Sequence, residues 1–201
     1  MILYHMSQTL QLGDMLYADY WGKSDRYQTL IQAFRDGLNC VCDLIEIKRM
    51  EASVDWNDLV KWCVEGAFEY IRETEFSPLP SRLSSNYYFE DLSNFEKLYQ
   101  AGWAQEPAEI QAQIRLFELE LAEDQPRKFD MCIFDEAFDV MVERQDIQFV
   151  LDSARRYFSG EQTAEPIWEI MSDKPARAVK DITAFLHGES VWQYKELNSL
   201  R

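Results

Sequence analysis

Three side chains that lie far apart in the sequence have types and surroundings suited to chemistry on a small molecule. His5 is one of two histidines in the chain and follows Tyr4 in a short apolar run. Tyr88 belongs to a run of three aromatic residues, and Glu169 is an acid with apolar neighbours on both sides. An imidazole and a carboxylate can exchange hydrogen bonds and stabilise charge, and an aromatic ring can hold a flat group. Each residue also has a plain structural interpretation, as a core histidine, a core tyrosine and an acid at the edge of a strand or helix.

The spacing of two tyrosines carries a resemblance to a known family. Tyr88-Phe-Glu-Asp, followed by Tyr99 on the next expected helix, resembles the strand–helix motif of ADP-ribosyltransferases of the His-Tyr-Glu type. Tyr4-His5 is similar to the first strand of that family, although Met6 replaces the glycine that often follows the histidine. The resemblance implies that NAD is a co-substrate. Tyr88 would then lie against its nicotinamide ring, Tyr99 would support that ring, and His5 would bond a ribose hydroxyl.

The same resemblance implies a carboxylate late in the chain, facing the ribose next to nicotinamide. Glu169 is the first candidate, and Glu196 in Tyr194-Lys-Glu-Leu is the alternative. Breaking the bond from nicotinamide to ribose passes through a state with positive charge on the sugar. A carboxylate bonded to the 2′-hydroxyl stabilises that state more than it stabilises bound NAD, which is the condition for catalysis.

The segment of residues 72–82, Arg-Glu-Thr-Glu-Phe-Ser-Pro-Leu-Pro-Ser-Arg, is similar to a bacterial family of unknown function that is grouped by fold with the ADP-ribosyltransferases. Arg82, expected at a strand edge, has the donor geometry to bind a phosphate or carboxylate, and its alternative is a surface ion pair. Ser81 or Ser84 would place the amide of the nicotinamide ring.

The function that the resemblance implies is transfer of ADP-ribose from NAD to a macromolecule, such as a protein target, or to water, as an NAD glycohydrolase. Two alternatives stay open. One is a relative without catalytic activity that binds a nucleotide. The other is an acidic interaction protein, such as a nucleic-acid mimic or antagonist, that docks on a basic partner.

The composition narrows the classes of partner. The net charge of −16 argues against direct binding to nucleic acid or to an anionic membrane, because both need clustered Lys and Arg. No apolar run approaches the roughly 20 residues that span a bilayer, and the first residues do not resemble a signal peptide, so a cytoplasmic protein is expected. Cys40-Val-Cys42 is too tight for a usual zinc site, so no metal is expected, and the four cysteines are expected to be reduced and mostly buried.

The elements that must position these residues follow from apolar periodicity. Alternating or continuous apolar runs predict strands, and apolar residues at helical spacing predict helices. The predicted strands are residues 2–7, 83–89, 115–121, 129–134 (as a hairpin with the strand before it), 176–182 and 191–197. The predicted helices are residues 25–35, 38–50, 55–72, 91–99 and 145–157. This order favours one α+β domain over residues 1–201, with the split, mostly antiparallel sheet of the ADP-ribosyltransferases and helices inserted after the first strand.

Overall fold

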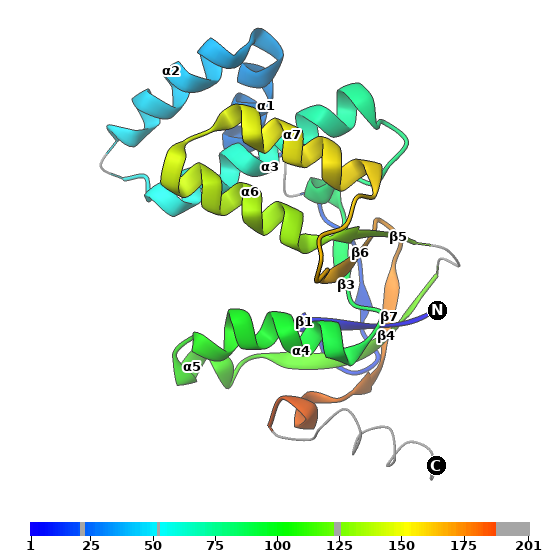
Figure 1. Cartoon of the computed structure of the whole chain (residues 1–201). Coiled ribbons are helices and arrows are strands. Elements are labelled where there is room, and N and C mark those ends of the chain that lie inside the picture. The colour runs from blue at the N-terminus through cyan, green and yellow to red at the C-terminus, as the bar shows by residue number, and fades with distance from the viewer. Residues whose placement is uncertain (21–22, 52, 123–125, 188–201) are drawn as a thin grey trace. The chain divides into compact units, whose positions relative to one another are not determined.

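The chain folds into two compact units of different secondary structure (Figure 1). The computed structural model describes residues 1–20, 23–51, 53–122 and 126–187. Of these residues, those within 1–18, 87–126 and 167–187 form a sheet unit, and those within 19–86 and 127–166 form a helical unit. Two compact units can belong to one domain, so the expected single domain over residues 1–201 stays a prediction.

The sheet unit is built on four antiparallel strands in the order β1-β4-β7-β2. They are β1 (Ile2–Ser7), β2 (Met15–Leu16), β4 (Arg115–Leu121) and β7 (Ala176–Asp181). Leu3 pairs with Leu119, and Leu119 pairs with Ala178 on its other side. The alternating pattern of residues 115–121 therefore becomes the strand between two neighbours, with a register shift at Glu118.

Two apolar clusters lie in the sheet unit, one on each face of the four-stranded sheet. Leu3 and Leu119 share one cluster with Tyr88 and Ile170, from the strands β3 (Asn86–Tyr88) and β6 (Trp168–Ser172), which lie side by side in a second sheet. Leu116 belongs to the other cluster, with the apolar residues of α4 (Leu92–Ala101). Side chains of successive strand residues point to opposite faces, so the strands supply both clusters at once.

The helical unit is organised around one long helix, α3 (Trp56–Glu75). Asp55 begins it by accepting hydrogen bonds from the backbone N–H groups of Asn57 and Asp58. Gly66 lets α1 approach closely, because a Cβ there would lie 3.3 Å from the Cβ of Leu30. The other elements of the unit are α1 (Asp25–Asp36), α2 (Leu38–Arg49), β5 (Arg127–Asp130), α6 (Met131–Arg144) and α7 (Ile147–Ser159).

Most of the predicted elements are confirmed, and the chain is α+β. The strands of residues 2–7, 115–121 and 176–182 and the helices beginning near residues 25, 38, 55, 91 and 145 are present. Short helical turns at α5 (Ala108–Gln111), η3 (Trp103–Gln105) and η4 (Thr183–His187) complete the described chain. The split sheet specific to ADP-ribosyltransferases stays a prediction, and the strand predicted at residues 191–197 lies outside the described residues, as does Glu196.

Two predicted strands are right only in part. Residues 129–134 do not form a hairpin strand, because Asp130 accepts a hydrogen bond from the N–H of Cys132 and starts α6. Residues 83–89 form only the three-residue β3, because Ser81 caps a helical turn, η2 (Arg82–Ser84), just before it. In both places a polar cap overrides an apolar run.

The expectation of mostly buried cysteines is also only partly right. Cys63 is buried on α3, and Cys132 is half-buried. Cys40 and Cys42 are exposed on α2, the helix that contributes only Val41 and Ile45 to the buried core. All four cysteines lie within the described residues, and none of them forms a disulfide there.

Candidate functional site

His5 and Tyr88 lie next to each other in the sheet unit. Tyr4 and Phe89 exchange two backbone hydrogen bonds, of 2.8 and 2.9 Å, which fix β1 against the end of β3. His5 Nδ1 lies 2.8 Å from the carbonyl oxygen of Tyr87. The rings of His5 and Tyr88 then lie with their centroids 5.6 Å apart and their planes inclined at 52°. Two residues more than 80 positions apart in the sequence are thus held together by backbone contacts.

The hydrogen bond to Tyr87 determines the state of the His5 ring. A carbonyl oxygen only accepts, so Nδ1 carries the proton and donates it, which leaves Nε2 of the neutral ring as an acceptor. Burial lowers the pKa of His5 below its usual value, and the hydrogen bond to Tyr87 opposes this only in part. His5 is therefore neutral at pH 7 and suited to accept a hydrogen bond from a hydroxyl group.

Glu169 lies on β6, next to Ile170, and only 3 % of it is exposed. Ile170 shares an apolar cluster with Tyr88, which is completely buried. Because side chains alternate along a strand, Glu169 points to the face of β6 opposite the one on which Ile170 meets Tyr88. The structure thus places Glu169 on the strand beside that of Tyr88, with its carboxylate directed to the other face.

Tyr99 lies on α4 in a different environment from Tyr88. It stacks on Phe95, with ring centroids 5.9 Å apart and planes inclined at 29°. Tyr99, Phe95 and Phe89 belong to the cluster under α4, whereas Tyr88 belongs to the cluster on the other face of the four-stranded sheet. The structure brings His5 and Tyr88 together and does not bring Tyr99 into the same cluster.

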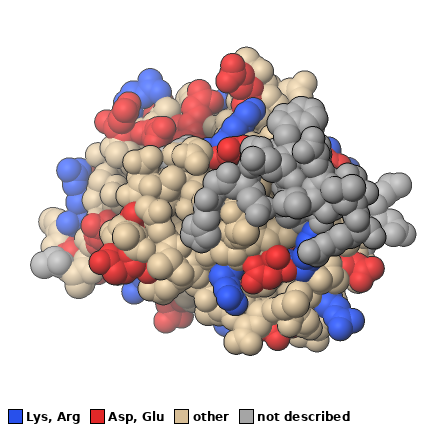
Figure 2. All heavy atoms as spheres, turned by 90° about the horizontal axis from the view of Figure 1, so that it is seen from below, with Lys and Arg blue, Asp and Glu red and all other residues tan. Residues whose placement is uncertain are grey.

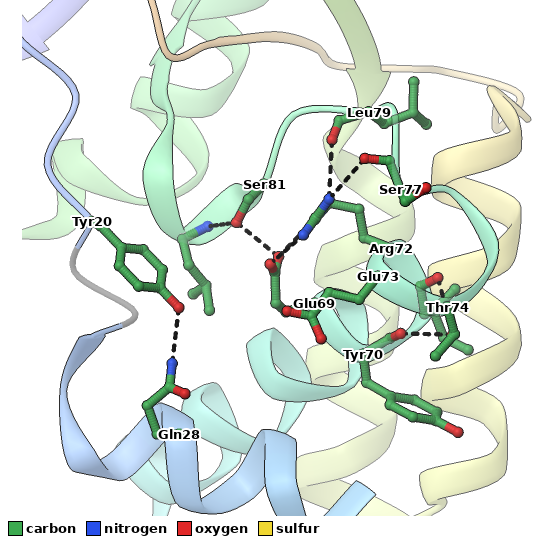
Figure 3. Close-up of polar contacts among 12 residues, drawn as sticks. Tyr20, Gln28, Glu69, Tyr70, Arg72, Glu73, Thr74, Ser77, Leu79 and Ser81 are labelled. Atoms are coloured by element: carbon green, nitrogen blue, oxygen red, sulfur yellow. Dashed lines mark hydrogen bonds and ion pairs between the residues drawn. The ribbon is translucent and has the colours of Figure 1, made fainter. Parts of the chain in front are cut away.

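Ser81 belongs to a polar network that holds the segment after α3 (Figure 3). Arg72 donates from Nε and Nη2 to the two carboxylate oxygens of Glu69, at 3.0 and 2.7 Å. Its Nη1 donates to the carbonyl oxygens of Ser77 and Leu79, both at 3.3 Å. Ser81 completes the network by donating its hydroxyl to Glu69 at 2.7 Å. Arg72 therefore replaces the regular backbone hydrogen bonds that the proline-containing segment cannot make.

Arg82 lies in the core of the helical unit, so its predicted place at a strand edge is wrong. Its Nε donates to Glu65 at 3.0 Å, and its Nη1 donates to the hydroxyl of Tyr157 at 2.8 Å. The guanidinium also lies 4.0 Å from the centre of the Phe134 ring. The alternative expected for Arg82 was a surface ion pair. The structure has an ion pair with Glu65, but it is buried. Whether Arg82 binds a phosphate stays a prediction.

Sequence reasoning missed the acids that pair with these arginines. Glu65 and Glu69 are 3 % and 4 % exposed and lie one turn apart on α3. The signal was present, because these two acids stand among Val64, Gly66 and Phe68 in a stretch with no other charge. Acids in such a stretch are rarely buried unless an arginine or lysine pairs with them.

Two features are absent from the described part of the chain. No group of three or more His, Cys, Asp or Glu side chains in it is arranged to hold a metal ion. None of its helices is both long and apolar enough to cross a membrane.

Comparisons with known proteins place the chain in a family without giving it an activity. No curated protein matches the sequence. A family model described as "Protein of unknown function (DUF2441)" matches residues 18–184, which is more than half of the chain. That span runs from α1 to β7 and includes neither β2 nor His5. The chain therefore belongs to the DUF2441 family, whose function is unknown.

Proposed function

We propose that this protein consumes NAD, transferring ADP-ribose to a macromolecule or to water. The observation that supports this function is the contact of His5 with Tyr88, made by the backbone bridge of Tyr4 with Phe89. A neutral imidazole with a free acceptor nitrogen beside a phenol ring is the pair that the resemblance assigns to the ribose and the nicotinamide.

The proposed reaction breaks the bond between nicotinamide and C1′ of its ribose. The electron pair of that bond leaves with nicotinamide, and the sugar develops positive charge. An acceptor hydroxyl or water then bonds to C1′ and loses its proton. His5 orients a ribose hydroxyl through Nε2, and Tyr88 provides a wall for the ring once the ligand has entered.

Glu169 is the proposed acid that stabilises the positive sugar. Its carboxylate is 3 % exposed, in surroundings where charge interactions are stronger than in water. Because its side chain points away from the Tyr88 cluster, Glu169→Gln tests this assignment separately from that of Tyr88. Ser81 and Arg82 bond Glu69 and Glu65, so their proposed part is to hold the segment that leads into β3.

The test is to incubate the protein with NAD, with and without cell lysate, and to measure free nicotinamide by chromatography. We expect release by the unaltered protein and a loss of about 100-fold in Glu169→Gln, as for removal of one group that stabilises transition-state charge. Glu120→Gln is the matched control, because Glu120 is an exposed acid on β4. His5→Gln is expected to lower release while the protein still folds.

The outcomes separate the functions. If no nicotinamide appears with any lysate, the enzymatic proposal is rejected. If it appears equally in Glu169→Gln and His5→Gln, the proposed residues are wrong. Thermal stabilisation by NAD without release would instead support a relative that binds the nucleotide and lacks activity.

A second candidate rests on the net charge of −16. Figure 2 shows Lys and Arg side chains scattered among acidic ones on the face in view. Such a protein could bind a basic partner through its acidic side chains. Association with a basic protein that weakens steeply as salt rises from 50 to 300 mM, in the absence of NAD turnover, would favour this function.

A further inference from the structure

A pocket of ≈ 340 Å³ in the helical unit has no part in the proposed function. The first turns of α1, the second half of α2, the residues just after α2 and Trp62 of α3 form its walls. Its volume is in the range of sites that take a small organic molecule. All of its lining residues belong to the helical unit, whereas His5 and Tyr88 belong to the sheet unit.

Arg26 is the basic group that characterises this pocket. Its guanidinium carbon lies 4.5 Å from the centre of the Trp62 ring. Among the described residues, no carboxylate pairs with Arg26, although the chain has 36 acids and 20 basic residues. Other arginines of the unit differ from Arg26 in this respect: Arg35 and Arg155, for example, each form an ion pair with a glutamate. Arg26 therefore keeps donors available for an anion from outside the chain.

The surroundings of Arg26 add a second cation and a rigid apolar wall. Lys48 also lines the pocket, and its ammonium bonds Glu51 at 2.9 Å in an exposed pair that a ligand can exchange at little cost. Trp62 packs on the buried cluster of Tyr27, Ile31 and Leu83, which fixes the indole beneath Arg26. Leu30 supplies further apolar surface.

We propose that this pocket binds a small organic anion: a flat ring that carries one carboxylate or phosphate group. Arg26 and Lys48 hold the anionic group, and the indole and leucine side chains contact the ring. The size matters, because the net charge of −16 repels a long polyanion. A small ligand interacts mainly with charges within about 10 Å, where these two cations lie together with the lining acids Asp25 and Glu51.

The test is calorimetric titration of the full chain with two charged probes, adenosine 5′-monophosphate and indole-3-acetate. Their uncharged counterparts are adenosine and indole-3-acetamide. We expect at least one charged probe to bind about tenfold or more tightly than its counterpart, and the probe that binds tells phosphate from carboxylate. Arg26→Gln is expected to lower the affinity for that probe by about tenfold or more, and Lys48→Gln is expected to lower it as well.

Arg49→Gln is the matched control. Arg49 also lies over an indole, that of Trp56 at 5.1 Å, but it does not line the pocket. The Arg49→Gln variant should bind the probe as tightly as the unaltered protein does. His5→Gln should also bind it unchanged, and this result would separate the pocket from the proposed NAD site. The proposal is overturned if neither charged probe binds, if Arg26→Gln binds unchanged, or if Arg49→Gln weakens binding as much as Arg26→Gln.

Discussion

The ion pair of Glu65 with Arg82 is predicted to contribute strongly to the stability of the helical unit. The two residues are 3 % and 5 % exposed, and Arg82 also donates to the hydroxyl of Tyr157. Arg82→Met keeps an apolar side chain against the ring of Phe134 but removes the charge that faces the buried carboxylate. Removing one partner of a buried pair costs about 3–5 kcal/mol. We therefore expect Arg82→Met to lower the free energy of unfolding by about that amount.

The assay is urea unfolding followed by circular dichroism, with linear extrapolation to water. Arg155→Met is the control, because Arg155 and Glu75 form a pair that is 40 % and 38 % exposed. An exposed pair is worth about 1 kcal/mol or less, so this variant should stay close to the unaltered protein. Adding Glu65→Gln to Arg82→Met should recover part of the loss, because the second change removes the buried charge.

If Arg82→Met costs no more than Arg155→Met, the buried ion pair does not contribute strongly to stability. If the double variant is less stable than Arg82→Met alone, the cost does not come from a buried charge. Melting curves of the same variants test whether each unfolds in one cooperative step.

Three further predictions concern separate features. Burial lowers the pKa of His5, so below pH 6.5 the unfolded state binds more protons than the folded state, and the free energy of unfolding decreases as the pH decreases. His5→Gln should remove this pH dependence from urea midpoints measured between pH 7 and 5, and an unchanged dependence would contradict the prediction. Asp55→Ala should cost about 1 kcal/mol in the same assay, and no loss would show that the α3 cap is dispensable. Burial raises the pKa of the Cys63 thiol to about 12, whereas Cys40 and Cys42 are exposed. At pH 8 a thiol reagent should therefore label Cys40 and Cys42 rapidly and Cys63 only after unfolding, which mass spectrometry of the labelled folded protein checks.

The sequence predicted elements well where one pattern ran without interruption. The residues of 115–121 alternate in a single period, and Phe117, Leu119 and Leu121 are indeed buried in β4. Asp55 stands directly before an apolar helical face, and it does cap α3. Here local preference and tertiary packing favour the same structure.

Prediction failed where an apolar run contained a residue able to cap a helix. In residues 129–134 only Phe129 and Asp130 continue a strand, and Ile133 begins the helical spacing of α6. Asp130 also accepts hydrogen bonds from the backbone N–H and the hydroxyl of Thr163, both at 2.7 Å. Those partners lie 33 residues away, so no local window of sequence reveals them.

The candidate site was predictable only in part. The contact of His5 with Tyr88 follows from strands that the sequence indicated, although their pairing was not visible in it. The direction of Glu169 depends on which residue of β6 faces the apolar cluster, and a shift of one residue reverses it. The pairing of Arg82 with Glu65 was missed because ion pairs between distant elements leave no spacing pattern.

The pairing of β1 with β4 has a consequence for the way the protein is made. Ile2 pairs with Glu120, and β7, the other neighbour of β4, is synthesised later still. At a synthesis rate of about 5–20 residues per second, β1 is complete several seconds before its partner strand β4 is synthesised. The helical unit is also incomplete at that point, because α6 and α7 follow β4 along the chain. Nascent chains of this protein therefore expose Leu3 and its neighbours until β4 has been synthesised, and we expect a chaperone that binds extended apolar segments to recognise them.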